Sequence, residues 1–293
     1  MNVLSLFDGM SCGQIALNRA GVTPKKYYAS ELDKYAIKVT QANYPETVQL
    51  GDVTRWRGWD IDWASIDLLI GGSPCQGFSF AGKQLAFDDP RSKLFFVYVD
   101  ILNHIRSVNP NVRFLLENVK MKKEYLAVIS EQLGVEPVFI NSALLSAQNR
   151  QRYYWANWEF GQPEDRGIVL ADILLSDYDD NFNVSDRQLE RLSTIGLIDG
   201  GARVCFQSPS QNVVKSECLQ ARDYKGIAGR QYFTVAMTRG RLRKLTPVEY
   251  ERLQTVPDNY TDHVSNTQRY KMLGNGWTVD VIAHIFKCLK GAA

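Results

Sequence analysis

Short apolar runs alternate with longer amphipathic segments through the first 160 residues of the chain. This alternation is typical of strands and helices that follow one another in a parallel sheet. The pattern predicts strands at 3–7, 27–30, 66–70 and 113–117, a strand end at 50–53, and a closing pair at 138–141 and 152–158. It predicts helices at 14–20, 33–42, 94–108, 123–133 and 279–289. We therefore expect an α/β fold with a Rossmann-like sheet.

The pattern weakens between residues 161 and 240, where the predicted helices become short and glycines and a Ser-Pro pair interrupt the chain. This composition favours a second, loop-rich domain inserted before the C-terminal helix. We expect residues 1–160 plus 270–293 to form the first domain, and residues 161–269 to form a small second domain and its hinge.

Composition limits the compartment and the kinds of site. The five cysteines are scattered and form no CxxC pair, which argues against a disulfide framework and against a structural zinc site. No segment approaches the roughly 18 apolar residues that a membrane helix needs, and the first residues lack the features of a signal peptide. We expect a protein without metal in a reducing, cytoplasmic setting.

The formal net charge of +2 is too small to indicate a polyanionic partner by itself. Its distribution is more informative, because residues 203–244 hold nine basic residues and two acidic ones, a local charge of +7. An acid-rich stretch, 164–199, precedes this window. A charge run is usually a solvated face, but this arrangement also suggests a surface that faces a polyanion.

The stretch 71–79 reads GGSPCQGFS and follows the predicted strand 66–70. Glycine permits unusual backbone angles and proline removes an N–H donor, so the strand ends abruptly. Cys75 then lies on a loop at the carboxyl end of a strand, where open α/β sheets bind ligands. A lone cysteine is more often a small buried residue, but proline, glycines and polar neighbours favour an accessible one. Cys75 is a candidate nucleophile if its thiolate is stabilised.

Three other predicted strands end in residues that suit an adenosine-like ligand. The turn 8–13 allows close backbone approach, although it lacks the GxGxxG pattern. Glu31 follows the second strand, where a carboxylate can accept both ribose hydroxyls, and Asp52 follows the third, where it can accept from an adenine amine. Each acid alone is more often a helix cap or a solvated residue. Three successive strand ends together favour an adenosyl cofactor.

Two further motifs carry polar groups that can assist a nucleophile. Glu117 ends the predicted strand 113–117, where a dry environment would let it donate a proton, although a capping role is equally open. In the sequence QNRQR at 148–152, period-two spacing predicts that Arg150 and Arg152 share one face. Two arginines there can hold a phosphate and a carbonyl oxygen. A solvated strand edge is the alternative.

In this order, the motifs resemble those of the cytosine-C5 DNA methyltransferases, and the match covers nearly the whole catalytic domain. The matching pieces are LFDGMSCG (6–13), Glu31, GDV (51–53), GGSPCQGFSFAGK (71–83), ENV (117–119), QNRQR (148–152), RKLTPVEYERLQTVPDNY (243–260) and LGNGWTVDV (273–281). Some features are similar to the vertebrate de novo branch. The chain shows no accessory reader domain, which indicates a bare catalytic unit of bacterial or phage type.

The resemblance implies a chemistry for the motif residues. The target cytosine would be flipped out of duplex DNA because its C6 atom is unreachable in the stack. Cys75 would add to C6, Glu117 would bind N3 and the exocyclic amine, and Asn118 would help to position the base. Arg152 would hold the O2 carbonyl, and Arg150 would support the site and the DNA backbone. C5 would then attack the methyl group of S-adenosyl-L-methionine.

The resemblance also implies binding sets. The cofactor set is Phe7, Asp8, Gly9, Met10, Cys12, Gly13, Glu31, Leu32, Asp52, Val53, Gly72, Pro74, Leu94, Asn275, Gly276 and Trp277. The DNA-binding set is Ser79, Lys83 and Arg91 on a loop that would close over DNA, and Arg222, Lys225, Arg230 and Arg239 in a target-recognition domain. The chain departs from many members at Ser11-Cys12, where they carry a glycine pair, and at Gly276, where they carry serine.

Three alternatives remain open. A tRNA cytosine methyltransferase would share the catalytic domain, but its Cys-Phe-Thr signature is matched here only by Cys205-Phe206. A catalytically inert DNA-binding relative would be expected to lose Cys75 or Glu117. A nicotinamide-dependent dehydrogenase fits the order of elements but not the Pro-Cys motif. We expect double-stranded DNA as the substrate, a possible companion restriction endonuclease, no required oligomer, and a bacterial or phage-infected host cell.

Overall fold

The computed structural model describes residues 1–74, 93–194, 203–206, 215–229 and 234–291. Its contacts divide the chain into two compact units. The first unit comprises Met1–Ile140, Gln151–Gln162 and Val281–Ala293, and the second comprises Asn141–Arg150 and Pro163–Asp280. By this division the residues 141–150 and 270–280 go with the second unit. The functional boundaries expected at 160 and 270 stay a prediction.

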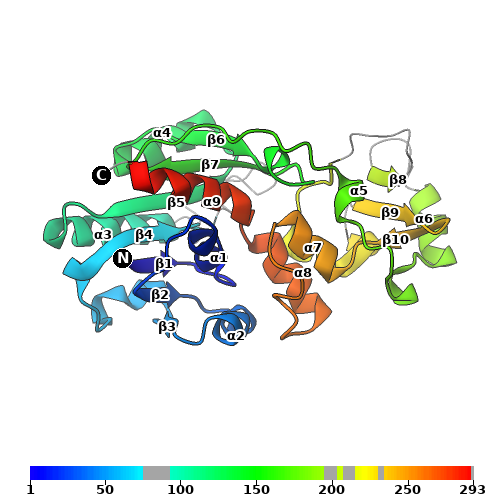
Figure 1. Cartoon of the computed structure of the whole chain (residues 1–293), viewed down its shortest axis with the longest axis horizontal. Helices are drawn as coiled ribbons and strands as arrows, with labels where there is room; N and C mark the ends of the chain where they lie inside the picture. Colours follow the sequence, from blue (N-terminus) through cyan, green and yellow to red (C-terminus); the bar gives the residue numbers. More distant parts are fainter. Residues whose placement is uncertain (75–92, 195–202, 207–214, 230–233, 292–293) are drawn as a thin grey trace. The chain divides into compact units, whose positions relative to one another are not determined.

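A seven-stranded sheet in the order β3-β2-β1-β4-β5-β7-β6 forms the centre of the first unit (Figure 1). Its strands are β1 (Asn2–Leu6), β2 (Lys26–Ser30), β3 (Val48–Gln49), β4 (Ile66–Gly71), β5 (Arg113–Val119), β6 (Val138–Asn141) and β7 (Gln151–Ala156). The pairs β1–β2, β2–β3, β1–β4 and β4–β5 are parallel, whereas β7 runs antiparallel to β5. The expected α/β fold with a mostly parallel sheet is confirmed.

Among the described residues, four α-helices lie between strands of this sheet in the chain and a fifth follows the second unit, all at positions close to those predicted. They are α1 (Cys12–Arg19), α2 (Lys34–Asn43), α3 (Lys93–Val108), α4 (Lys123–Leu133) and α9 (Val279–Lys287), most of which belongs to the first unit. In α3 the residues Phe95, Val99 and Leu102 are buried, whereas Asp100 and Asn103 are exposed. That helical spacing of apolar residues explains how the helix packs against the sheet.

The second unit has a three-stranded sheet in the order β10-β9-β8 and short helices. Its strands are β8 (Arg203–Phe206), β9 (Thr234–Thr238) and β10 (Arg241–Lys244), and its helices are α5 (Leu170–Ile173), α6 (Asp186–Thr194), α7 (Pro247–Leu253) and α8 (Asn266–Asn275). Arg239 and Gly240 join β9 to β10 with φ angles of 52° and 70°. Two successive positive φ angles give the tight turn that matches the twist of a hairpin.

The helix α7 begins with a complete capping box, as its sequence TPVE suggests. The Thr246 side chain accepts from the Glu249 N–H at 3.2 Å, and the Glu249 carboxylate accepts from the Thr246 N–H at 2.7 Å. Pro247 occupies the first helical turn, where its missing N–H costs nothing.

Candidate active site

The ends of β4 and β5 bring two of the predicted motifs together. The strands are parallel neighbours, with Gly71 opposite Leu116. Just beyond, the Asn118 side-chain amide donates to the Ser73 hydroxyl at 3.2 Å, and both residues are buried. The nucleophile strand and the acid strand are therefore adjacent, as the catalytic hypothesis requires. Cys75 itself lies outside the described residues, which stop at Pro74 on this loop.

Gly71, the last residue of β4, allows the close approach of a helix. A Cβ atom at this position would lie 3.0 Å from the Leu6 carbonyl oxygen and 3.1 Å from the Tyr98 ring. The Tyr98 hydroxyl donates to the Leu115 carbonyl at 3.1 Å, and burial raises the Tyr98 pKa well above its ordinary value. Tyr98 is therefore a neutral donor that joins α3 to the central strands.

Glu117 and Arg152 form an ion pair, with 2.8 Å between Oε1 and Nε. Their side chains are only 11% and 13% exposed. The antiparallel register of β5 and β7 sets Glu117 opposite Tyr154, so Arg152 lies two residues along on the same face. Arg152 also donates to the Gln151 carbonyl at 2.8 Å. The sequence predicted both residues as functional, but their pairing depends on a strand register that the sequence does not display.

Arg150 occupies a different environment from Arg152, and the expected common face of the QNRQR motif is not formed. The strand β7 begins at Gln151, so the period-two pattern does not extend back to Arg150. Arg150 belongs to the second unit and is 4% exposed. Its guanidinium donates to the carbonyls of Leu219 and Gly276 at 3.2 and 2.8 Å. The structure therefore places Arg150 among backbone carbonyls.

The turn between β1 and α1 has an unusual backbone. Phe7, Gly9 and Ser11 have φ angles of 58°, 59° and 60°, the left-handed region that side chains disfavour. Glu31 holds this turn, since its Oε2 accepts from the Gly9 N–H at 2.7 Å and its Oε1 accepts from the Leu32 N–H at 2.7 Å. A Cβ on Gly9 would meet nothing within 4 Å. The backbone here borders open space in which a ligand can approach closely.

The side chains beside this turn suit a nucleoside. Leu32 is 70% exposed, an unusual position for a large apolar residue, and Phe7 is partly buried against the core. An exposed apolar side chain next to Glu31 in the sequence suits a purine, and the Glu31 carboxylate suits its ribose hydroxyls. Met10 is buried in the turn, and Cys12 and Gly13 are buried at the start of α1.

Asp8, also in the predicted cofactor set, has its carboxylate bonded within the protein. It accepts from the hydroxyls of Ser11 and Tyr27, the latter at 2.7 Å. Burial raises the pKa of the Asp8 carboxyl to about 6, against the lowering effect of these hydrogen bonds. Ser11 and Tyr27 were not singled out as partners of Asp8, because the carboxylate is brought to Tyr27 only by the pairing of β1 with β2.

Asp52 caps a short 3₁₀ segment, Val53–Gly58, which was the alternative that its sequence position left open. Its Oδ1 accepts from the N–H and the hydroxyl of Thr54 at 2.9 and 2.8 Å. These hydrogen bonds hold the pKa of Asp52 below its ordinary value. Of the other residues in the predicted set, Val53 is buried, whereas Gly72, Pro74 and Leu94 are half-buried.

Asn275 is the last residue of α8 in the second unit, and Gly276 and Trp277 follow it. Asn275 is exposed, and Gly276 and Trp277 are half-buried. Beneath them, the Gly276 carbonyl accepts from Arg150 at 2.8 Å and from the Gln254 side-chain amide at 3.1 Å. Asn275 is therefore exposed at this segment, while the buried Arg150 and Gln254 side chains hold the backbone next to it.

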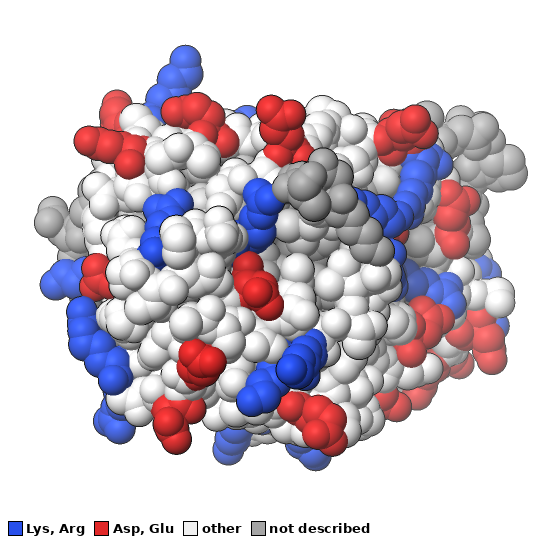
Figure 2. All heavy atoms as spheres, turned by 60° about the vertical axis from the view of Figure 1, so that its left-hand side comes forward, with Lys and Arg blue, Asp and Glu red and all other residues white. Residues whose placement is uncertain are grey.

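Part of the basic window consists of structural residues. Arg243 is fully buried and pairs with Glu249 at 2.6 Å, and Lys215 donates to the Ala143 carbonyl at 2.7 Å. At the hairpin turn, Arg239 binds Asp177 at 2.9 Å. Since Glu249 and Asp177 lie outside the window, the count of +7 overstates the basic surface. Acidic and basic side chains are interspersed over the face that Figure 2 displays.

Of the predicted DNA-binding residues, Arg222 and Lys225 are exposed on the 3₁₀ segment Ala221–Gly229. The Arg222 Nε donates to the Gln220 side-chain oxygen at 3.2 Å. Ser79, Lys83, Arg91 and Arg230 lie outside the described residues.

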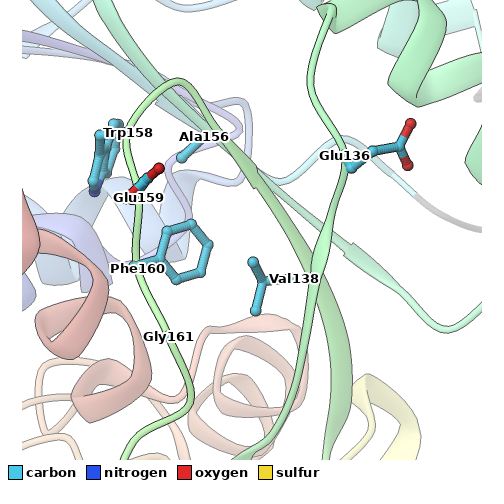
Figure 3. A pocket seen from close by; sticks show the side chains of 7 residues that line it. All are labelled: Glu136, Val138, Ala156, Trp158, Glu159, Phe160 and Gly161. Atoms are coloured by element: carbon cyan, nitrogen blue, oxygen red, sulfur yellow. The ribbon is translucent and has the colours of Figure 1, made fainter.

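A cavity of about 500 Å³ lies elsewhere in the first unit, lined by Glu136, Val138, Ala156, Trp158, Glu159, Phe160 and Gly161. Figure 3 shows the side chains of Phe160 and Val138 directed toward each other, while the Glu136 carboxylate points away from them. None of the predicted site residues lines it. Among the described residues, no group of His, Cys, Asp and Glu side chains is suited to a metal ion, and no helix is long and apolar enough to cross a membrane.

Comparisons with known proteins address the whole chain. A family model described as C-5 cytosine-specific DNA methylase matches residues 1–161 and 157–291. Type II methyltransferase M1.ScrFI of Lactococcus lactis subsp. cremoris is 32% identical, over 96% of this chain and 75% of its own length. Type II methyltransferase M.NlaX of Neisseria lactamica is 31% identical, over 99% and 96%. The solved structure of the Entamoeba histolytica methyltransferase EhMeth is similar in fold, with a TM-score of 0.79, 17% identity, and coverage of 99% and 98%.

Proposed function

This chain belongs to the C-5 cytosine-specific DNA methylase family, and we propose that it methylates C5 of cytosine in a short sequence of double-stranded DNA through a covalent Cys75 adduct. The enzyme class, DNA cytosine-5 methyltransferase, is carried by the family match and the type II relatives. The observation that supports the covalent mechanism best is the buried Glu117–Arg152 pair beside the strand end that leads to Cys75.

The spacing of that pair suits one edge of a cytosine. The ring atom N3 and the exocyclic oxygen O2 lie side by side on one edge of the base, so one base can bind a carboxyl group and a guanidinium that lie 2.8 Å apart. In this proposal the protonated Glu117 carboxyl donates to N3 and accepts from the exocyclic amine, and Arg152 donates to O2. Both side chains are nearly buried, so these interactions act with little competition from water. Asn118, fixed by Ser73, keeps the end of β5 in place.

Because C6 is inaccessible in stacked DNA, the cytosine must first be flipped out. The Cys75 thiolate then forms an S–C6 bond, and the displaced electron pair makes C5 nucleophilic. When bound, S-adenosyl-L-methionine supplies an electrophilic methyl group for C5. Transfer of the C5 proton to solvent water leaves an electron pair that re-forms the C5–C6 double bond, and breakage of the S–C6 bond releases methylated cytosine and the thiolate. Glu117 and Arg152 hold the charge that develops on the ring.

The turn after β1 supports the assignment of the adenosyl cofactor. Glu31 already accepts N–H donors from Gly9 and Leu32, so its carboxylate is held where ribose hydroxyls can compete for it. The open space at Gly9 and the exposed Leu32 would admit the nucleoside. We also assign Asn275–Trp277 to cofactor binding and exposed Arg222 and Lys225 to DNA. A companion restriction endonuclease in the same bacterial cytoplasm would fit the type II relatives.

The decisive experiment is base-resolution sequencing of methylcytosine in a plasmid from cells that express this chain. We expect methylation at C5 within one short motif, its loss in Cys75→Ala, and its retention in the matched control Cys288→Ala. Unmodified DNA from folded wild-type protein would contradict DNA methylation, and the same assay on tRNA would follow. Methylation that persists in Cys75→Ala would contradict the covalent mechanism alone.

A further inference from the structure

We propose that Arg150 is a positioning residue that couples DNA binding at residues 219–225 to cofactor binding at residues 274–277. The inference rests on the proposed function, which assigns Arg222 to DNA and Asn275–Trp277 to the cofactor. All of these residues belong to the second unit. The link between the two segments is built from a backbone contact, a buried guanidinium and a buried amide pair.

The backbone contact lies at Gly274, in the last turn of α8. A Cβ atom here would be 2.1 Å from the carbonyl carbon of Gln220 and 2.4 Å from the amide nitrogen of Ala221. No side chain fits at such distances, so the two backbones touch directly. A shift of residues 220 and 221 toward α8 must therefore displace Gly274, because no compressible side chain separates them.

The guanidinium of Arg150 holds both segments at once. Its Nη1 donates to the Leu219 carbonyl at 3.2 Å and to the Gly274 carbonyl at 3.4 Å, and its Nη2 donates to the Gly276 carbonyl at 2.8 Å. A guanidinium is planar and presents its donors in a fixed geometry. The three carbonyls are thus kept in a defined arrangement around one rigid group.

Two buried amide side chains, those of Gln148 and Gln254, also connect residue 219 to residues 273–276. Gln148 accepts from the Leu219 N–H at 2.9 Å, and its amide donates to the Gln254 side-chain oxygen at 3.2 Å. Gln254 in turn donates to the carbonyls of Leu273 and Gly276 at 2.7 and 3.1 Å. Gln148 and Gln254 are fully buried. Leu219 is therefore fixed through its N–H by Gln148 and through its carbonyl by Arg150.

An exposed residue lies next to each of the two connected segments. Arg222 lies beside Gln220, to which it is hydrogen-bonded, and Asn275 directly follows Gly274. DNA bound at Arg222 would shift residues 219–221 and, through Gly274 and Arg150, residues 274–277 toward the arrangement that binds the cofactor. A cofactor that binds afterwards would no longer bear the free-energy cost of that shift. DNA therefore tightens cofactor binding, and the cofactor tightens DNA binding by the same factor.

The test measures the affinity of S-adenosylhomocysteine by calorimetry, with the protein alone and saturated with sonicated unmethylated plasmid DNA. We expect DNA to tighten binding by about fivefold or more in the wild type, within the usual range for coupled sites. In Arg150→Lys the factor should fall to near one while both ligands still bind. The control Arg252→Lys makes the same change at an arginine that pairs with Asp258, and it should keep the wild-type factor.

Hydrogen exchange gives a second measurement that needs no variant. Saturating DNA should slow amide exchange in wild-type residues 219–229 and also in 273–278. Slower exchange confined to 219–229 would overturn the proposal, as would a coupling factor that Arg150→Lys leaves unchanged. Wild-type protein that binds no S-adenosylhomocysteine or no DNA would instead contradict the proposed function, so the two failures are distinguishable.

Discussion

The interiors of the two units of this protein differ in how many charged and amide groups they bury. The first packs apolar side chains around its sheet, and Leu69, Phe114 and Trp155 are completely buried there. The second buries charged and amide groups as completely, among them Arg243 and Glu249. Apolar packing is non-directional and tolerates changes of similar volume. A buried polar network needs every partner in place. We infer that the buried polar network fixes the positions of loops in the second unit and makes this unit less tolerant of substitutions.

The largest effect is expected for the buried pair of the second unit. Glu249 receives two hydrogen bonds from Arg243, and it also accepts from the N–H groups of Thr246 and Leu175. Glu249→Ala would leave the guanidinium buried without its partner, so we expect a loss of about 3–5 kcal/mol in the free energy of unfolding. Urea denaturation measures it.

The matched control for Glu249→Ala is Asp258→Ala, which removes the partner of the half-exposed Arg252. It should cost less than about 1 kcal/mol, because water replaces the lost carboxylate. Equal losses in the two variants would contradict the importance that we give to burial.

A smaller but still large effect is expected in the apolar unit. Leu69 is fully buried in the central strand β4, and Leu69→Ala should cost about 2–5 kcal/mol by the lost burial and the cavity left behind. The conservative Ile70→Val in the same strand should cost about 0.5–1.5 kcal/mol. If both substitutions cost the same, packing would not be what stabilises this unit.

The third effect depends on pH and concerns Asp8, in the turn after β1 of the first unit. Burial raises the pKa of Asp8 from 3.8 to about 6. Between these values the folded state binds more protons than the unfolded state, so this group's stabilisation, complete below pH 3.8, is lost as the pH rises through 6. Asp8→Asn should remove that loss, at about 1.4 kcal/mol per pKa unit.

Urea denaturation of wild type and Asp8→Asn between pH 4 and 8 tests this expectation. The variant should gain stability relative to the wild type as the pH rises, and most of the gain should fall below about pH 7. The control Asp60→Asn changes an exposed carboxyl and should follow the wild-type curve. Parallel curves for Asp8→Asn and wild type would show that Asp8 titrates alike in the folded and unfolded states.

The sequence predicted most strands and helices of the first unit, because apolar periodicity and turn residues act locally. The sequence also predicted that the candidate active site lies where the strands end near Ser73 and Asn118, because turn-forming or polar residues follow each apolar run. The sequence did not predict the ion pair of Glu117 with Arg152, because this pair depends on the register between two strands that are distant in the chain. The role of Gly274 likewise depends on Gln220 and Ala221, far away in the chain.

The route of the chain has a consequence for its synthesis. The polypeptide passes from one unit to the other after Ile140, Arg150, Gln162 and Asp280. The first unit thus lacks α9 until nearly the whole second unit has left the ribosome. Ile282, Ile285 and Phe286 of α9 are completely buried, and Trp158 donates to the Ile285 carbonyl at 3.1 Å. We therefore expect the first unit to expose during translation the apolar surface that α9 later covers, a state in which a nascent chain is prone to aggregate.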